Sequence, residues 1–414
     1  MRDILPPESG RWRHFTSVFA DVVEAAGYQQ VIPPLLEDLG VFTRIGDATD
    51  VVTKEMYDFV DKGERRVALR PEQTASVCRA FAQHRPAVLP WKVFYSGPNF
   101  RYEKPQRGRY RQFDQVGIEV LGVDDPMLDV EVIALGWEFY RRLGLQQVAL
   151  IVNSLGEPED RGRYVDALRT HFEAAGEALT EQSRITLAKN PLRVLDSKRA
   201  PDQAFIASAP QIADFYSGDA AEHFDRVQAG LRALDIPFTV EPKLVRGLDY
   251  YRSTIFEFQG GTFDSAQNGL GGGGRYDGLV EALGGPATPG IGFALGVDRT
   301  LLACDDEGVF PADPLVLDAF VVDAVGGLEA AAITSELRAA GLSSDRSFEN
   351  RSVKAQMKQA NRSDAAFALI VGEQEAADGT IVVKPMRGGD QQTIPRTDLI
   401  TYLSGSPLSG ETDS

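Results

Sequence analysis

The sequence predicts an α+β protein whose long first part is built on an antiparallel sheet flanked by helices. Two strand-like runs, 91–103 and 110–122, enclose a turn rich in lysine and arginine and predict an antiparallel hairpin. Helical periodicity fills about 158–236, and after residue 314 strands alternate with helices, which is typical of a small α/β domain. The 414 residues are enough for two or three domains.

Composition excludes several classes of protein. Hydrophobic content of 43% and charged content of 25% are ordinary for a soluble globular chain, and no apolar run approaches the length of a membrane helix. The net charge of −17 argues against indiscriminate nucleic-acid binding. Cys78 and Cys304 lack metal-ligand spacing, and the four histidines are scattered, so we expect no protein-built metal cluster. A chain with so few cysteines and no signal peptide fits the reducing cytoplasm.

The elements of the first part are predicted from the periodicity of apolar residues and from the glycines and prolines that end them. Apolar residues at helical spacing predict a helix from about 10 to 26, which Gly27 ends. The prolines after it keep 28–38 extended. We expect a helix over 126–143, a strand over 149–156, and β structure again over 237–259.

The acid, glycine and proline content of 304–314 predicts a linker. Beyond it we expect elements in the order strand, helix, short strand, helix, strand and a last helix near 397–403. The predicted domains are therefore 1–310, with a helical insertion at about 158–236, and 311–404, followed by a polar disordered tail over 405–414.

The basic turn is the most informative segment. Arg101, Lys104, Arg107, Arg109 and Arg111 fall within eleven residues of an acidic protein. Arginine grips phosphate or carboxylate with a planar fork, so the segment predicts anion contact. The alternative is a solvated basic hairpin face.

Three further segments combine glycine with arginine or tyrosine. Arg246 stands beside Gly247 and ahead of two tyrosines, which suits a cleft that holds a small ring; a core strand with one surface arginine is the alternative. The glycine run 269–285 indicates close backbone approach to a ligand, or else a flexible linker, but has no Walker spacing. In 290–303 a glycine-rich strand enters a helix that carries Arg299, without dinucleotide-binding spacing.

These segments together resemble a known family. IPPLLED with Pro34, FRYE…GRYRQFDQ and GIGFALGVDR are similar to motifs 1, 2 and 3 of class II aminoacyl-tRNA synthetases. LVRGLDYY and GGGGRYDGLV resemble the two signature peptides of the histidyl-tRNA synthetase family, and ALRPEQTAS and NPLRVLDSK add to the match. The resemblance implies the class II antiparallel sheet, a helical insertion and a C-terminal α/β anticodon-binding domain.

The resemblance also implies roles for individual residues. Arg246 and Arg101 would be the catalytic cations at the α-phosphate, with Arg246 also against the amino acid carboxylate. ATP would be bound by Arg101, Glu103, Arg109 and Arg299. Histidine would be bound by Glu72, Gln73, Thr74, Arg101, Gln115, Glu119, Arg246, Tyr250, Tyr251 and Tyr276. The candidate tRNA contacts are Gln106 and, on a basic helix of the last domain, Arg351, Lys354 and Lys358; a merely solvated basic helix is the alternative.

The implied reaction is ATP-dependent attachment of L-histidine to tRNA(His) through a histidyl-adenylate, which releases AMP and diphosphate. ATP would act as a substrate with Mg²⁺, without a tightly bound cofactor, in a homodimeric cytoplasmic enzyme that needs no membrane. Attack of a carboxylate on a phosphoryl group calls for charge compensation rather than a protein nucleophile, and clustered arginines suit that. The rivals are a histidine-sensing regulatory subunit of ATP phosphoribosyltransferase and a synthetase for threonine or proline.

Overall fold

The computed structural model describes residues 1–44, 51–104, 107–195, 197–244, 250–263, 268–312 and 316–405. The chain separates into two compact units, Met1–Ala312 and Asp313–Ser414. The predicted tail beyond residue 405 lies outside the described residues. Within the described ranges, no helix is long and apolar enough to cross a membrane.

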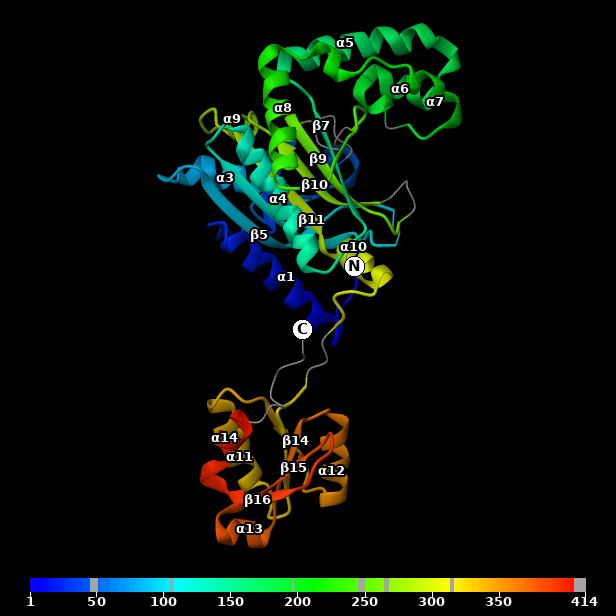
Figure 1. Ribbon diagram of the computed structural model, residues 1–414. Coiled ribbons are helices and arrows are strands. Elements are labelled where there is room, and N and C mark those ends of the chain that lie inside the picture. The colour runs from blue at the N-terminus through cyan, green and yellow to red at the C-terminus, as the bar shows by residue number, and fades with distance from the viewer. Residues whose placement is uncertain are drawn as a thin grey trace. The chain divides into compact units, whose positions relative to one another are not determined.

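An eight-stranded sheet forms the centre of the first unit (Figure 1). Every pairing from β5 to β7 is antiparallel, whereas the short edge strands β1 and β8 pair in parallel. In spatial order the strands are β1 (Gln29–Gln30), β5 (Trp91–Phe100), β6 (Gln112–Leu121), β11 (Gly290–Gly296), β10 (Gly269–Arg275), β9 (Arg252–Gly260), β7 (Val148–Ser154) and β8 (Thr239–Val240). The predicted antiparallel hairpin and the predicted α+β fold are confirmed.

Helices cover this sheet. They are α1 (Glu8–Glu24), α4 (Pro126–Arg142), α8 (Gly218–Ala233), α9 (Leu279–Ala282) and α10 (Val297–Glu307). Aromatic side chains fill the layer between helices and strands: Phe15 and Phe19 of α1 pack edge-on against Phe139 of α4 at 5.0 and 5.1 Å between ring centroids. Asp125 caps α4 by accepting a hydrogen bond of 2.8 Å from the Met127 N–H, and Pro126 suits the first helical turn.

The first unit also contains a three-stranded sheet and two short helices, which are formed by residues 36–84. The sheet has the order β2 (Leu36–Asp38), β4 (Arg66–Leu69) and β3 (Tyr57–Val60). The helices are α2 (Leu39–Thr43) and α3 (Thr74–His84), and Val51–Glu55 form one π-helical turn. Of these elements only β2 lies in a segment predicted to be extended, 28–38, and the others were not predicted.

The helical segment predicted at about 158–236 contains α5 (Pro158–Ala175), α6 (Glu181–Lys189), α7 (Ala200–Ala207) and α8. Figure 1 shows α5, α6 and α7 grouped beyond one end of the sheet. They have a core of their own that includes Leu168, Phe172 and Ile206, whereas Phe224 and Val227 of α8 belong to the core of the main sheet. The segment is thus partly a separate helical cluster and partly a layer of the main domain.

The second unit is a five-stranded sheet with helices. Its strands have the order β13 (Ser344–Arg346), β12 (Ala319–Asp323), β14 (Phe367–Val371), β15 (Thr380–Pro385) and β16 (Gln392–Pro395). The first three are parallel and the last two antiparallel. The helices are α11 (Leu328–Ala339), α12 (Val353–Arg362), α13 (Glu373–Asp378) and α14 (Leu399–Ser404). The α/β pattern was predicted, but β15, β16 and α13 were not.

The prediction of a linker from Cys304 is wrong at its start. Helix α10 continues through Glu307, and Cys304 is fully buried in the core of the main sheet. The helix ends only at Gly308, whose φ of 71° is the left-handed conformation that commonly closes a helix.

Candidate active site

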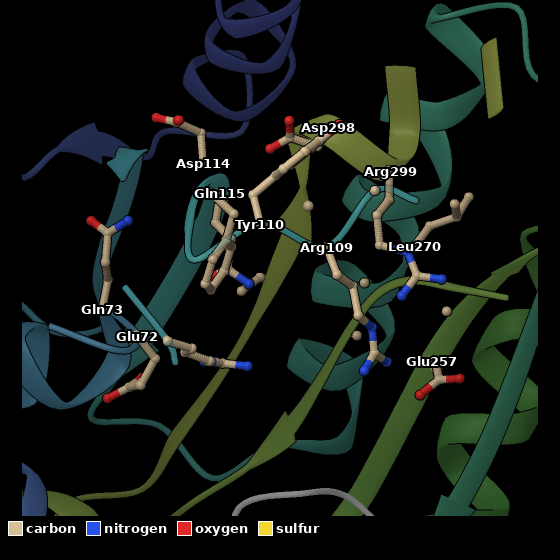
Figure 2. Close-up of a pocket in the computed structure, with 18 of the residues that line it drawn as sticks. Glu72, Gln73, Arg109, Tyr110, Asp114, Gln115, Glu257, Leu270, Asp298 and Arg299 are labelled. Atoms are coloured by element: carbon tan, nitrogen blue, oxygen red, sulfur yellow. The ribbon is translucent and has the colours of Figure 1, made fainter. Parts of the chain in front are cut away.

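A cavity of about 420 Å³ opens in the first unit. Its wall comes from the start of α3, the hairpin β5–β6, the strands β9, β10 and β11, and the first turn of α10 (Figure 2). The predicted site residues on the wall are Glu72, Gln73, Thr74, Arg101, Glu103, Arg109, Gln115, Tyr250, Tyr251 and Arg299. Segments up to about 230 residues apart in the sequence therefore meet at one cavity.

The remaining predicted residues fall into three groups. Glu119 and Tyr276 lie directly behind the wall and are bonded to its members. Arg246 and Gln106 fall outside the described residues. The candidate tRNA residues Arg351, Lys354 and Lys358 belong to the second unit, so they take no part in this cavity.

Glu119 is the centre of a buried hydroxyl cluster. Its Oε1 accepts hydrogen bonds from the Thr74 hydroxyl at 2.6 Å and the Tyr95 hydroxyl at 3.1 Å, and Oε2 accepts one from the Tyr276 hydroxyl. Burial raises the pKa of the Glu119 carboxyl to about 8, although the hydroxyl donors oppose the shift. The group can therefore exchange a proton near neutral pH.

A second buried carboxylate, Glu72, caps the start of α3. Its two oxygens accept the N–H groups of Thr74 at 2.7 Å and Ala75 at 2.9 Å. These N–H groups have no partner inside the helix, and a negative charge is favourable there. Burial nonetheless raises the pKa of Glu72. The cap fixes Thr74 so that its hydroxyl reaches Glu119.

Arg101 lines the cavity and is held in position by two contacts. Its Nε donates to the Pro71 carbonyl at 2.9 Å, and its guanidinium lies 5.2 Å from the centroid of the Phe113 ring. Nearby, the side-chain amide of Gln115 accepts a hydrogen bond of 2.8 Å from the buried Asn99. The Arg101 side chain is thereby directed along the cavity wall.

Two more arginines mark the opposite end of the cavity. Arg109 Nη1 lies 3.4 Å from Glu103 Oε2. Figure 2 shows the guanidinium groups of Arg109 and Arg299 pointing into the same part of the cavity as the Glu257 carboxylate. Burial lowers the pKa of Arg299, and the neighbouring Arg109 lowers it further. Two cations held together in this way form a site for a multiply charged anion.

Paired aromatic rings close the acidic end. The rings of Tyr250 and Tyr251 are 4.7 Å apart, and Tyr250 meets Tyr276 edge-on at 5.8 Å. Burial raises the pKa of Tyr250 and Tyr276 well above its ordinary value, so both hydroxyls remain donors. Flat apolar faces with polar tips suit a small heteroaromatic ring.

The glycine run forms the floor. Gly269–Arg275 is strand β10 rather than a loop or a linker, and Gly271 and Gly272 line the cavity. A Cβ on Gly292 of β11 would overlap Glu119 Oε2, and one on Gly273 would overlap the Gly292 carbonyl oxygen. The strands and Glu119 can approach this closely only because these residues lack side chains.

Sequence reasoning missed several wall residues, among them Tyr95, Asp114, Glu257 and Asp298. Burial raises the pKa of Asp114 to about 6, and the nearby Asp298 contributes to the shift. Arg2 Nη2 bonds to Asp298 at 3.1 Å. Asp114 and Glu257 both lie in segments that were predicted to be β structure. Because side chains alternate between the two faces of a strand, the residues on the same face as a predicted site residue were the available signal.

The family model described as Histidyl-tRNA synthetase matches residues 1–300, and the model described as Anticodon binding domain matches residues 320–405. A histidine–tRNA ligase of Listeria innocua is 44% identical over 98% of this chain and 97% of its own. One from Rhodococcus erythropolis is 46% identical over 97% of this chain and 95% of its own.

Solved structures agree with the sequence relatives. The crystal structure of apo S. aureus histidyl-tRNA synthetase has a TM-score of 0.83 and 36% identity, and the match covers 97% of this chain and 98% of that one. An ATP phosphoribosyltransferase regulatory subunit/histidyl-tRNA synthetase from Bacillus halodurans has 19% identity and a TM-score of 0.62, which shows a shared fold alone. The matches along nearly the whole length establish that this chain belongs to the histidyl-tRNA synthetase family.

Proposed function

We propose that this chain attaches L-histidine to tRNA(His) in two steps at the cavity. Histidine and ATP first form a histidyl-adenylate and release diphosphate, and the histidyl group then passes to the tRNA 3′ end with release of AMP. The observation that carries the proposal is the polarity of the cavity. Buried carboxyls and tyrosines gather at one end, and guanidinium groups gather at the other.

Histidine occupies the acidic end in this proposal. Glu119 and a tyrosine hydroxyl, that of Tyr251, bind the two imidazole nitrogens, while Tyr250 and Tyr276 enclose the ring. Glu72, Thr74 and Gln115 bind the amino group, with Gln73 on the same wall. An amino acid without ring nitrogens would leave buried polar groups unpaired, and such a site can discriminate without an editing step.

ATP occupies the basic end. Arg101 binds the α-phosphate, Arg299 the γ-phosphate and Arg109 a further phosphate oxygen, while Glu103 binds the adenine edge. Arg246 is assigned to the α-phosphate and the histidine carboxylate. The chemistry brings two anionic groups together, so these cations act by compensating charge and positioning the attack. Loss of one such donor typically lowers the rate by about 10²–10³.

Mg²⁺ is expected to arrive with ATP. Among the described residues no group of three potential ligands could hold a metal ion alone. The Glu103 and Glu257 carboxylates line the basic end, and Mg²⁺ commonly combines one or two protein carboxylates with substrate phosphates. When bound, the ion would neutralise phosphate charge, and Glu257 would hold it, since Glu103 is assigned to the adenine edge.

The regulatory-subunit alternative is disfavoured by the second unit. A sensor of histidine has no need of an anticodon-binding domain, whereas residues 320–405 match one. Arg101, assigned as a catalytic cation, and Arg299, assigned to ATP, are also present on the cavity wall.

We also propose a homodimer, in the cytoplasm. Apolar side chains concentrate on the surface of the segment that leads from β1 into β2: Ile32 is 82% exposed, and Leu35 and Leu36 are about half exposed. Such contiguous exposure favours an interface, since burial of apolar surface contributes about 25 cal/mol per Å². Analytical ultracentrifugation of Ile32→Asp should show a weakened dimer; an unchanged association constant would refute this interface.

Pyrophosphate exchange into ATP tests the reaction. The purified chain is assayed with each of the twenty amino acids in turn, and exchange is expected with histidine alone. Exchange driven by threonine or proline, or none with histidine, would contradict the pocket assignment.

A truncated chain ending at Ala312 tests the second unit. Exchange should survive because the cavity lies wholly in Met1–Ala312, while charging of tRNA should weaken. Equal charging by the truncated and full-length chains would show that the second unit does not bind tRNA.

A further inference from the structure

The segment before α1 reaches the wall of the cavity through one side chain. Arg2 Nη2 donates a hydrogen bond of 3.1 Å to Asp298 Oδ1, across 296 positions of the sequence. The Arg2 guanidinium also lies 5.0 Å from the centroid of the Tyr110 ring and 5.8 Å from that of Trp12. Asp298 and Tyr110 line the cavity, whereas the described lining residues do not include Arg2. Arg2 therefore supports the wall and does not form part of it.

Both contacts of Arg2 with the wall are made next to the cations of the basic end. Asp298 directly precedes Arg299 in the first turn of α10. Tyr110 directly follows Arg109 in the turn between β5 and β6. Arg2 contacts the neighbour of each cation, so these two neighbours lie close together, as Figure 2 shows. One side chain thereby connects two segments from distant parts of the sequence.

The buried Asp298 carboxylate benefits from this contact. Its side chain is 7% exposed, and the N–H groups of Asp114 and of Asp298 itself donate to it. Burial raises the pKa of the carboxyl, and the hydrogen bond and the charge of Arg2 oppose that shift. A buried charge without a partner is costly. Arg2 therefore favours the ionised carboxylate, which joins strand β6 to the first turn of α10.

The two cations must be held together before ATP binds. Burial lowers the pKa of Arg299, and the charge of Arg109 lowers it further because the two guanidinium groups repel each other. The turn that carries Arg109 rests on α10: a Cβ on Gly108 would lie 2.9 Å from Leu302 Cδ1 and 3.2 Å from Arg299 Cγ. A site whose cations are already in position loses less free energy to ordering when an anion binds.

We propose that Arg2 is a positioning residue for ATP: it fixes the residues next to Arg109 and Arg299, so that both cations face the outer phosphates together. The inference rests on the proposed function, which assigns these two arginines to phosphates of ATP. Arg2 itself contacts neither substrate in this proposal. Its loss should therefore weaken only those ligands that carry the β- and γ-phosphates.

Binding of ATP and of AMP to Arg2→Met tests the inference. Isothermal titration calorimetry without histidine measures the Kd of each nucleotide while no adenylate can form. Methionine keeps the apolar part of the side chain and removes the guanidinium. The variant should bind ATP about fivefold to tenfold more weakly, because the lost bond joins two charged groups and is partly exposed. The Kd for AMP, which lacks the outer phosphates, should equal that of the parent chain.

Two further variants accompany Arg2→Met. Arg2→Lys keeps a cation near Asp298 and the aromatic rings, so it should recover most of the affinity for ATP. Arg13→Met is the matched control, since Arg13 is an exposed arginine of α1 in the same part of the chain. It should bind both nucleotides as the parent chain does.

A double-mutant cycle tests whether Arg2 acts through Asp298. Arg2→Met, Asp298→Asn and the double variant are compared in their affinity for ATP. If the ion pair carries the effect, the second change should add little to the first. Additive effects would mean that Arg2 acts on ATP independently of Asp298, and they would overturn the positioning role.

Two results in Arg2→Met would also overturn the inference. One is an unchanged affinity for ATP. The other is an equal loss of affinity for ATP and AMP, which would mean that Arg2 supports the cavity as a whole. Neither result would contradict the proposed function, because histidine-dependent pyrophosphate exchange is measured separately on the parent chain. Absence of that exchange would instead refute the proposed function.

Discussion

The Thr74 hydroxyl donates a hydrogen bond of 2.6 Å to Oε1 of Glu119, which joins the first residue of α3 to strand β6. Glu72 caps the same helix end, so the position of the hydroxyl depends on a second carboxylate. The acidic end of the cavity is therefore one bonded unit rather than a set of independent side chains.

Thr74→Val should distinguish the effect of the hydrogen bond between Thr74 and Glu119 from the effect of side-chain packing. Valine preserves the shape but removes the hydroxyl, and a buried polar group left without a hydrogen-bond partner costs about 1–3 kcal/mol. We expect KM for histidine to rise at least about tenfold in pyrophosphate exchange. The matched control is Ser76→Ala in the same helix, since the buried Ser76 hydroxyl has no partner among the described residues. Equal effects of the two changes would contradict a specific role for Thr74.

Glu119 should make the stability of the unliganded protein fall as pH rises. Burial raises the pKa of its carboxyl from 4.5 to about 8, so between these values the folded chain binds a proton that the unfolded chain has lost. The free energy of unfolding must then decrease across that window. Glu119→Gln should flatten the decrease, as measured by Tm from about pH 5 to pH 9. Parallel curves for the two proteins would show that Glu119 is ionised in the folded chain.

Gly292→Ala should disrupt the site by steric overlap alone. The added methyl group would overlap Glu119 Oε2 and the Ile118 carbonyl, and backbone cannot yield as a flexible side chain can. We expect destabilisation of about 2–4 kcal/mol, with loss of histidine-dependent exchange. Gly10→Ala in α1 is the control because a Cβ there meets nothing, and it should stabilise the helix by about 0.5–1 kcal/mol. A fully active Gly292→Ala enzyme would refute the close approach.

Arg70→Met should weaken both the fold and the ATP end. The buried Arg70 guanidinium donates to the carbonyls of Pro33 at 2.7 Å and Pro98 at 2.9 Å. The adjacent Pro71 carbonyl holds Arg101. Unfolding in urea should show a loss of about 3 kcal/mol, with a raised KM for ATP.

Arg65→Met provides the comparison for Arg70. The Arg65 side chain is 77% exposed and pairs with Asp61, so its loss should cost less than about 0.5 kcal/mol. A normal KM for ATP in a folded Arg70→Met protein would show that Arg70 does not help to position Arg101.

The parts of the fold that sequence predicted are those with a local signal. The hairpin β5–β6 was predicted from two strand-like runs around a turn rich in lysine and arginine, and helix α4 was predicted over 126–143. Strand β10 was not, because a run of glycine has low strand propensity. It is a strand because its neighbours approach too closely for any Cβ at Gly273.

The same distinction applies to the site. Arg101 was singled out by the basic turn and Arg299 by the glycine-rich strand before it, and both lie on the cavity wall. The dependence of Glu119 on Thr74, Tyr95 and Tyr276 arises from tertiary contacts between three distant segments, which no local pattern encodes. The role of the segment that carries Arg246 stays a prediction.

The glycines that form the floor of the cavity limit how the substrate preference of this enzyme can change. At Gly271, Gly273 and Gly292 every substitution adds atoms where main chain already lies, so the base of the binding chamber cannot be reshaped by exchanging one side chain for another. New preferences must arise on the walls, from side chains such as those of Gln73, Gln115 or Tyr251. A search for variants that accept histidine analogues would be most productive there.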